Sequence, residues 1–461
     1  MAASLPISAG LKPGQALVVP AASPLGIHAP SLSLPLIFVV TGLLALFTGM
    51  GWLVAQPNML ATYHYNQTTI ALTHLFVLGW LCSVVMGAMY QLVPVALETK
   101  LYSERLARGQ FVFHVAGFAG MVWMFRIWNM KQVGNFGALL TVGVILFVYN
   151  IARTLLRVPK WNVIATAVAA ALVWLSLTVT AGLLIATAKY TATINLVSRF
   201  NPLSAMHAHA HLGVVGFFLM LIVGVSYKLI PMFTLSELQN RRRAAWSVIL
   251  LNLGLAGSFV TVLMDSRWKP AFALVVILAF ALYGWELMAM LRARKRRALD
   301  WGVKYFLTAI GLLVPASGLA LVLSWPGWPL NTFTGQLENV YGFLGLVGVV
   351  SFAIMGMLYK IIPFLVWFGA YSKHVGHARV PALAEMYSTR LQAAGYWTYL
   401  GGLAATMAAT LSSNATAVRW GCGLLALSLA LLAINIGKIL SHAIRPRLTP
   451  LAKPSINRIT L

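Results

Sequence analysis

Charged residues are scarce in this sequence. Only 9% of its 461 residues are Asp, Glu, Lys or Arg, while 60% are hydrophobic. A soluble globular protein carries about 25% charged residues, so this composition excludes an ordinary soluble domain. The chain needs lipid as its solvent, and the lipid bilayer is the first partner that the composition implies.

Acidic residues are the rarest of the charged groups. Eight Asp and Glu stand against 33 Lys and Arg, which gives a formal net charge of +25. In a soluble protein such a balance would point to nucleic acid. Here the basic residues lie between apolar runs, where they orient a chain in the membrane, so we expect no nucleic-acid partner.

Cysteine is almost absent. Cys82 and Cys422 both lie inside apolar runs, and neither a CxxC nor a CxxCH spacing occurs. This excludes a disulfide framework, a cysteine zinc site and covalent attachment of a c-type haem. We expect both cysteines to be packing residues.

Long apolar runs dominate what the sequence does contain. A helix needs roughly 20 apolar residues to cross the ~30 Å hydrocarbon core, and such runs recur from Leu34 to Leu440. They predict an all-α polytopic membrane bundle of about twelve transmembrane helices. The predicted spans cover residues 35–55, 69–94, 110–128, 136–156, 163–187, 209–232, 245–264, 271–291, 303–325, 340–368, 391–411 and 419–440.

Lys and Arg are distributed unevenly between the two sides of these spans. Most lie in the tails and the even-numbered connections, with the densest cluster at residues 292–297. The positive-inside rule then places both tails, residues 1–33 and 444–461, in the cytoplasm. The first tail lacks the pattern of a signal peptide. We expect a multi-pass protein of a bacterial-type inner (plasma) membrane.

A short pattern recurs in the second, sixth and tenth predicted spans. The second and sixth share a histidine, two glycines, a tyrosine and a proline at identical spacing, and the tenth has Phe343 at the histidine position. This match predicts three pseudo-symmetric four-helix repeats, over residues 34–160, 161–300 and 301–443. The matching residues are His74, Gly79, Gly87, Tyr90 and Pro94, then His211, Gly216, Gly224, Tyr227 and Pro231, then Gly348, Gly356, Tyr359 and Pro363.

The repeated residues divide between two faces of each helix. At about 100° per residue, the glycines, the tyrosine and the proline lie on the side opposite the histidine. Small residues let helices approach closely in lipid, so the glycine face is predicted to be scaffold and the tyrosines to form hydrogen bonds between helices. The histidine face is predicted to point into the bundle.

Histidines near the outer ends of these spans are the candidate ligands. His74 and His211 are equivalent, and His207 lies one turn before His211, a spacing typical of metal or haem ligands. His209 points almost oppositely, and His64 lies in the short outer loop before the second span. We interpret His74, His211 and His207 as cofactor-binding candidates, and His207, His209, His211 and His64 as candidate metal ligands. The alternative is a set of interfacial, merely hydrogen-bonded histidines.

Two other ionisable residues in the spans receive structural interpretations. His114 lies in a different depth layer, nearer the cytoplasmic side. Glu286 lies clearly within a span and is expected to form an ion pair with the basic cluster at residues 292–297.

The pattern resembles subunit I of the haem-copper oxidase superfamily, and within it the nitric oxide reductase-like branch. The resemblance rests on twelve spans in three sets of four, and on the span-two histidine followed by the run Met86-Gly-Ala-Met-Tyr-Gln-Leu-Val-Pro94. It implies that His74 is an axial ligand of a low-spin haem b. It also implies that the region of His207, His209 and His211 holds a ligand of the active-site metal.

The sequence departs from this family in two places. The family has two histidines in span ten and a histidine pair in span seven. Here neither Asn339 to Pro363 nor the stretch around Asn252 contains a histidine. The usual binuclear centre is therefore expected to be absent, so catalytic residues are not assigned. The chain is similar to histidine-poor relatives that include haem-containing NO-response membrane proteins.

Three functions follow as hypotheses. The first is a haem b between spans two and six, bound by His74 and His211, for electron transfer or handling of NO or O2, with a separate c-type cytochrome or other redox subunit as partner. The second is a copper site centred on His207 and His211 and completed by His74 or His64, for metal delivery or protection from nitrosative stress. The third is a transporter or structural subunit without cofactor. The basic residues available to haem propionates are Arg126, Lys131, Arg199, Arg267 and Lys269.

Overall fold

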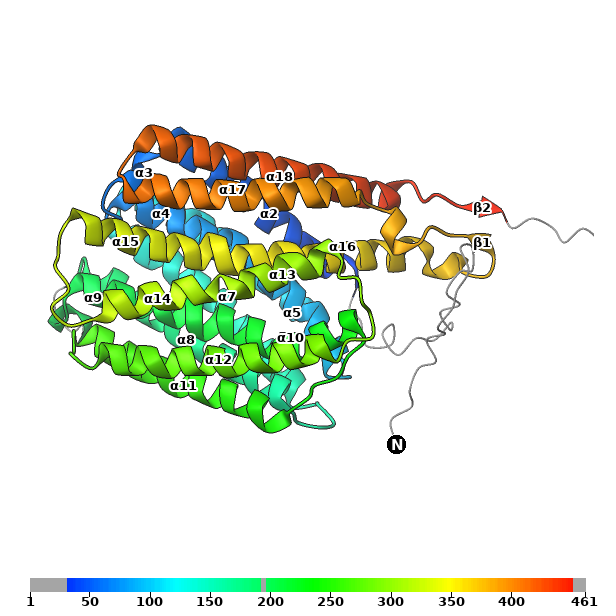
Figure 1. Cartoon of the computed structure of the whole chain (residues 1–461), viewed down its shortest axis with the longest axis horizontal. Coiled ribbons are helices and arrows are strands. Elements are labelled where there is room, and N and C mark those ends of the chain that lie inside the picture. Colours follow the sequence, from blue (N-terminus) through cyan, green and yellow to red (C-terminus); the bar gives the residue numbers. More distant parts are fainter. Residues whose placement is uncertain (1–30, 192–195, 451–461) are drawn as a thin grey trace, which may run out of the picture.

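The computed structural model describes residues 31–191 and 196–450. Within these residues the chain forms a bundle of twelve long helical spans that lie lengthwise beside one another (Figure 1). Ten of them are long and apolar enough to cross a membrane, which confirms the predicted polytopic all-α fold. The other two, α6 (Glu104–Arg126) and α17 (Thr389–Leu411), are less apolar and pack along α7 (Met130–Leu155) and α18 (Ala415–Ile444).

Span nine is bent, whereas most spans are single helices. The bend separates α13 (Trp301–Gly311) from α14 (Leu313–Ser324); it follows from Pro315, since a proline ring clashes with the carbonyl four residues earlier. The remaining single spans are α2 (Ser33–Ala55), α8 (Val163–Ala188), α11 (Arg241–Leu263) and α12 (Lys269–Arg292). Short elements are α3 (Asn58–Ala61), the 3₁₀ turns η2 (Leu196–Arg199), η5 (Ser372–His374) and η6 (Leu383–Glu385), and the antiparallel pair β1 (Ala378–Arg379) and β2 (Thr449–Pro450).

Spans two, six and ten each contain an eight-residue π-helical segment. Each segment begins at the residue after the position occupied by His74, His211 or Phe343. Segments of this kind are rare and occur often at functional sites. The three spans are α4 (Gln67–His74), η1 (Leu75–Cys82) and α5 (Ser83–Ala96), then α9 (Pro202–His211), η3 (Leu212–Leu219) and α10 (Met220–Thr234), then α15 (Thr332–Phe343), η4 (Leu344–Ser351) and α16 (Phe352–Tyr371).

Spans six and ten begin earlier than their apolar runs suggested. They start at Pro202 and Thr332 rather than near residues 209 and 340. The side chains of Asn201 and Asn331 accept hydrogen bonds from backbone amides of the first turn, and such caps fix where a helix begins. The polar first turns therefore belong to the helices. We call the end of the bundle where α4, α9 and α15 begin the histidine end; it lies at the left in Figure 1.

The glycine face of spans two, six and ten packs against the preceding span, as predicted. A Cβ added at any of three equivalent glycines would collide with a neighbour on α2, α8 or α13. Without a side chain the two backbones can approach closely, which supplies the packing that holds helices together in lipid. These contacts are Gly87 on Phe38, Gly224 on Ala167, and Gly356 on Tyr305.

Two buried asparagines at the opposite end of the bundle tie helix starts to their neighbours. Asn150 accepts from the Ser103 amide at 3.1 Å and donates to the Ser103 carbonyl at 2.8 Å. Asn435 does the same for Ser388, at 2.8 and 3.0 Å. Both pairs are 47 residues apart in the chain. Each asparagine satisfies one backbone donor and one acceptor that lipid could not satisfy.

Glu286 occupies the corresponding place on α12. Its Oε1 accepts from the amides of Gln239 and Asn240 at 2.6 and 2.9 Å, and its Oε2 lies 3.0 Å from Arg243 Nε. The predicted ion pair therefore exists, but its partner is Arg243 at the start of α11, not the cluster at residues 292–297. Glu286 thus plays on α12 the part that Asn150 plays on α7 and Asn435 on α18. Its buried negative charge is compensated by Arg243.

The two cysteines and two of the three repeated tyrosines follow the sequence expectations, whereas the buried hydroxyl of Tyr359 makes no hydrogen bond of ordinary geometry among the described residues. Cys82 and Cys422 are free and buried. The hydroxyl of Tyr90 donates to Gln110 at 3.2 Å, and that of Tyr227 bonds Ser247 at 2.6 Å.

Replacing Gly224 tests the packing of span six on span five. We expect Gly224→Ala to destabilise the bundle by about 1–3 kcal/mol, because the added methyl group overpacks the contact with Ala167. Gly284→Ala is the control, because nothing lies within 4 Å of a Cβ at that helical position. Thermal unfolding in detergent should show a lower melting temperature for the first variant alone. Equal melting temperatures would contradict this account.

Candidate functional site

A cavity of about 950 Å³ lies among the helices and extends to the loops at the histidine end. At this end its wall includes five histidines and two acids: His64, His74, His207, His209, His211, Asp265 and Glu338. It continues down to His114, whose Nε2 is hydrogen-bonded to Ser83 Oγ at 3.0 Å. The histidine candidates thus share one cavity, while His114 marks its deeper part.

His74 is held by its own helix. Its Nδ1 lies 2.8 Å from the carbonyl of Ile70, one turn earlier, and its ring lies 4.6 Å from that of Phe125 on α6. A carbonyl can only accept, so Nδ1 carries the proton and the neutral ring keeps a lone pair on Nε2. Histidines that bind metals are commonly oriented in this way.

His211 has the same anchor but a different partner. Its Nδ1 lies 2.7 Å from the carbonyl of His207, so Nε2 again keeps the lone pair. That lone pair accepts a hydrogen bond from the hydroxyl of Tyr341 on α15 at 3.2 Å. His211 is therefore engaged between spans six and ten. Among the described residues, no hydrogen bond or ring contact joins it to His74.

His209 lies on the other side of span six, as its offset of two residues from His211 predicted. Its ring contacts α8, where a Cβ added at Gly182 would lie 2.9 Å from His209 Cε1. The ring interacts electrostatically with His74 and with the backbone of Thr178. Its buried Nδ1 makes no hydrogen bond of ordinary geometry in the described part of the chain. His209 is thus the histidine of span six that faces span two.

Spans two and ten meet without an imidazole. Leu72 of span two is equivalent to His209 of span six, because each lies two residues before the repeated histidine. Phe343 of span ten is equivalent to His74. Both Leu72 and Phe343 are buried and apolar. Further along, the indole N–H of Trp80 donates to Ser351 Oγ at 3.0 Å. Within the described helices, one histidine thus lies between spans two and six and another between six and ten, but none lies between ten and two.

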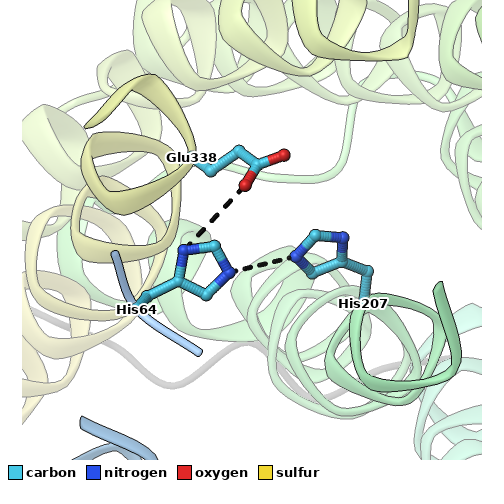
Figure 2. A group of neighbouring side chains, drawn as sticks. All are labelled: His64, His207 and Glu338. Atoms are coloured by element: carbon cyan, nitrogen blue, oxygen red, sulfur yellow. Dashed lines mark hydrogen bonds and ion pairs between the residues drawn. The ribbon is translucent and has the colours of Figure 1, made fainter. Parts of the chain in front are cut away.

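His64 joins the loop after α3 to spans six and ten (Figure 2). Its Nε2 lies 3.2 Å from Nε2 of His207, and its Nδ1 lies 3.0 Å from Oδ1 of Asn339. Glu338 Oε2 lies 3.9 Å from the same Nδ1. Burial lowers the pKa of His64, with a smaller opposing effect from the Asn339 hydrogen bond. Because the ordinary value is about 6.5, the ring is neutral at pH 7 and the contact with Glu338 is not an ion pair.

Asn339 fixes the conformation of this loop. Its Nδ2 donates to the carbonyls of Leu60 and Thr62 at 3.1 and 2.7 Å, and lies 2.9 Å from Gln336 Oε1. Its Oδ1 is therefore left to accept from His64. The amide thus determines both the position of His64 and which ring nitrogen carries the proton.

Glu338, Asn339 and Tyr341 were not identified as site residues from the sequence. The predicted span ten began near residue 340, so Glu338 fell in a loop. A signal was present, however: Asn339 lies four residues before Phe343, as His207 lies four before His211. Among the basic residues proposed for propionates, Arg267 and Lys269 line the cavity.

Comparisons with known proteins give a structural likeness alone. No family model matches the chain, and no curated protein matches it. A solved structure that it resembles is a haem-copper terminal oxidase dimer, with a TM-score of 0.61 and 13% identity over 92% of this chain and 86% of the other. The chain therefore has the fold of a haem-copper oxidase, as the resemblance in the sequence predicted.

Replacing Asn339 tests its hold on the loop. We expect Asn339→Leu to expose residues 60–66 to faster amide hydrogen exchange, because the carbonyls of Leu60 and Thr62 lose their donor at a cost of about 1–3 kcal/mol. Asn135→Leu, at an exposed position in the first turns of α7, is the matched control. Unchanged exchange in the first variant would show that other contacts hold the loop.

Proposed function

We propose that this membrane protein binds haem b at the histidine end, between spans two and six, for electron transfer or for handling NO or O2. One observation carries the proposal: His74, whose Nε2 keeps its lone pair, and His209 of span six line the same 950 Å³ cavity. Bound there, haem would supply one-electron chemistry and a site for a diatomic gas.

The second axial position is better supplied by His209 than by His211. The pair expected from the sequence was His74 and His211, but Nε2 of His211 accepts a hydrogen bond from Tyr341. His209 instead has a buried nitrogen without an ordinary hydrogen bond. A buried, unsatisfied polar atom is costly, and ligation through this nitrogen would satisfy it.

The proposed chemistry differs from that of an ordinary terminal oxidase. Span ten has Tyr341 and Phe343 at the histidine layer, and Asn339 to Pro363 contains no histidine. The ligands of the usual binuclear centre are thus missing, so we propose an oxidoreductase-like subunit whose electrons come from a separate c-type cytochrome or other redox subunit. The distribution of Lys and Arg supports cytoplasmic termini in a bacterial-type inner membrane, and the recurring π segments and glycine contacts support three repeats.

A copper-binding protein is the second candidate function. It is favoured by the distance of 3.2 Å between the Nε2 atoms of His64 and His207. This pair lies apart from His74 and Phe125, so it is compatible with haem binding and does not replace it.

A spectrum of the purified chain tests the haem proposal. The reduced-minus-oxidised difference should show a b-type band, and we expect His74→Ala and His209→Ala each to lower haem occupancy at least about tenfold, because each removes an axial ligand. His211→Ala should retain the band, and the exposed His377→Ala is the control.

The same variants separate the alternatives. Loss of the band in His211→Ala but not in His209→Ala would restore the axial pair expected from the sequence. A folded, monodisperse chain without haem after expression with haem supplied would overturn the proposal and favour a transporter or structural subunit.

A further inference from the structure

The lone pair of His64 points at His207. The two N–H groups of the Asn339 amide are committed to backbone and Gln336 oxygens, so its Oδ1 is the atom that faces His64 Nδ1. An amide oxygen can only accept, so Nδ1 of His64 carries the proton. Nε2 is then an unprotonated nitrogen of a half-buried ring in the cavity wall, 3.2 Å from Nε2 of the second imidazole.

The distance between the rings suits a shared metal ion. Zinc–imidazole bonds are about 2.0 Å long, and two such bonds at a tetrahedral angle separate their nitrogens by about 3.3 Å. The observed separation is 3.2 Å. An ion bound by both nitrogens would thus leave their separation almost unchanged. A hydrogen bond from His207 to His64 would have the same length, so the third group in the cluster distinguishes the two arrangements.

That third group is the carboxylate of Glu338, one oxygen of which faces the His64 ring and lies 3.9 Å from its Nδ1 (Figure 2). One oxygen of Glu338 and one nitrogen of each histidine lie within 4.8 Å of one another. The carboxylate side chain is 21% exposed, and no lysine or arginine pairs with it in the described part of the chain. The nearby Lys269 is bound to Asp265 at 2.6 Å. Two imidazole nitrogens and a carboxylate that forms no salt bridge with lysine or arginine among the described residues therefore lie together.

We infer that His64, His207 and Glu338 form a binding site for a divalent first-row transition-metal ion, with Asn339 as its positioning residue. The site uses neither His74 nor His209 and is separate from the proposed haem. The two nitrogens argue against Mg²⁺ and Ca²⁺, which prefer oxygen, and the absence of thiolate or thioether from the set argues against Cu⁺. The three protein ligands leave a coordination position open to water or a small ligand from the cavity.

Copper binding to the full-length protein tests the inference. The protein, purified in detergent and freed of metal with EDTA, is titrated with CuCl₂ and its electron paramagnetic resonance spectrum recorded. We expect one tightly bound Cu²⁺ per chain with hyperfine coupling to two imidazole nitrogens. His64→Ala and His207→Ala should each leave one coupled nitrogen and weaken binding at least tenfold, whereas His377→Ala, in an exposed loop, should change neither.

Two further variants keep the test independent of folding defects. Glu338→Gln preserves shape, so two nitrogens should remain while the g values shift and the affinity falls. Asn339→Ala should weaken binding 10- to 100-fold, the range for residues that orient a ligand, and broaden the spectrum. A two-nitrogen signal of unchanged strength in both His64→Ala and His207→Ala would overturn the inference, as would the absence of tight Cu²⁺ in the parent protein.

The haem and metal proposals can fail separately. A chain that binds Cu²⁺ as described but never shows a b-type band would retain the metal site and lose the proposed haem function. A chain with the band, but with copper binding insensitive to His64 and His207, would do the reverse. His74→Ala should keep the two-nitrogen copper signal, because that residue lies outside the cluster.

Discussion

Within a bilayer the Nδ1–H of a histidine finds no water, and in His74 and His211 it donates to the carbonyl one turn earlier. This constraint, that polar groups must be satisfied internally, organises the histidine end. It fixes the tautomer of both rings and frees Nε2 for another partner. Each π segment begins directly after these positions. Spans two and six thus share a histidine ring, the carbonyl that it bonds and a π segment that follows. Span ten has the π segment but Phe343 in place of the histidine.

The same fold places its imidazoles differently from the family it resembles. The resemblance implied a haem ligand on span two, paired in the family with span ten. Here span ten presents Phe343, and Trp80 bonds Ser351 where the two spans meet. His74 instead lines the cavity with His209 of span six. A shared fold does not determine function, and here the fold is kept while the helix faces that carry histidine differ.

Much of the fold could be predicted, and the reason is physical. Apolar length predicts spans, and glycines spaced along a helix predict its packing face, as Gly87 and Gly224 illustrate. The direction of His209, opposite His211, followed from helical geometry. What the sequence could not disclose depended on contacts across the chain. The turn of 100° per residue that holds for an α-helix does not hold through the π segments, and amino-acid composition does not reveal where these segments lie. The start of span ten depended on the Asn331 cap, and missing it excluded Glu338 from the candidate site.

The hydrogen bond between His64 and Asn339 joins residues 275 positions apart. The ribosome makes the loop with His64 long before it makes span ten. Because Leu60 and Thr62 also bond Asn339, this loop cannot reach its final form while only the first eight spans are inserted. The cluster of His64, His207 and Glu338 is therefore completed late in biogenesis. A partly synthesised chain would contain His64 and His207 without the hydrogen bond to Asn339 that orients His64 toward His207.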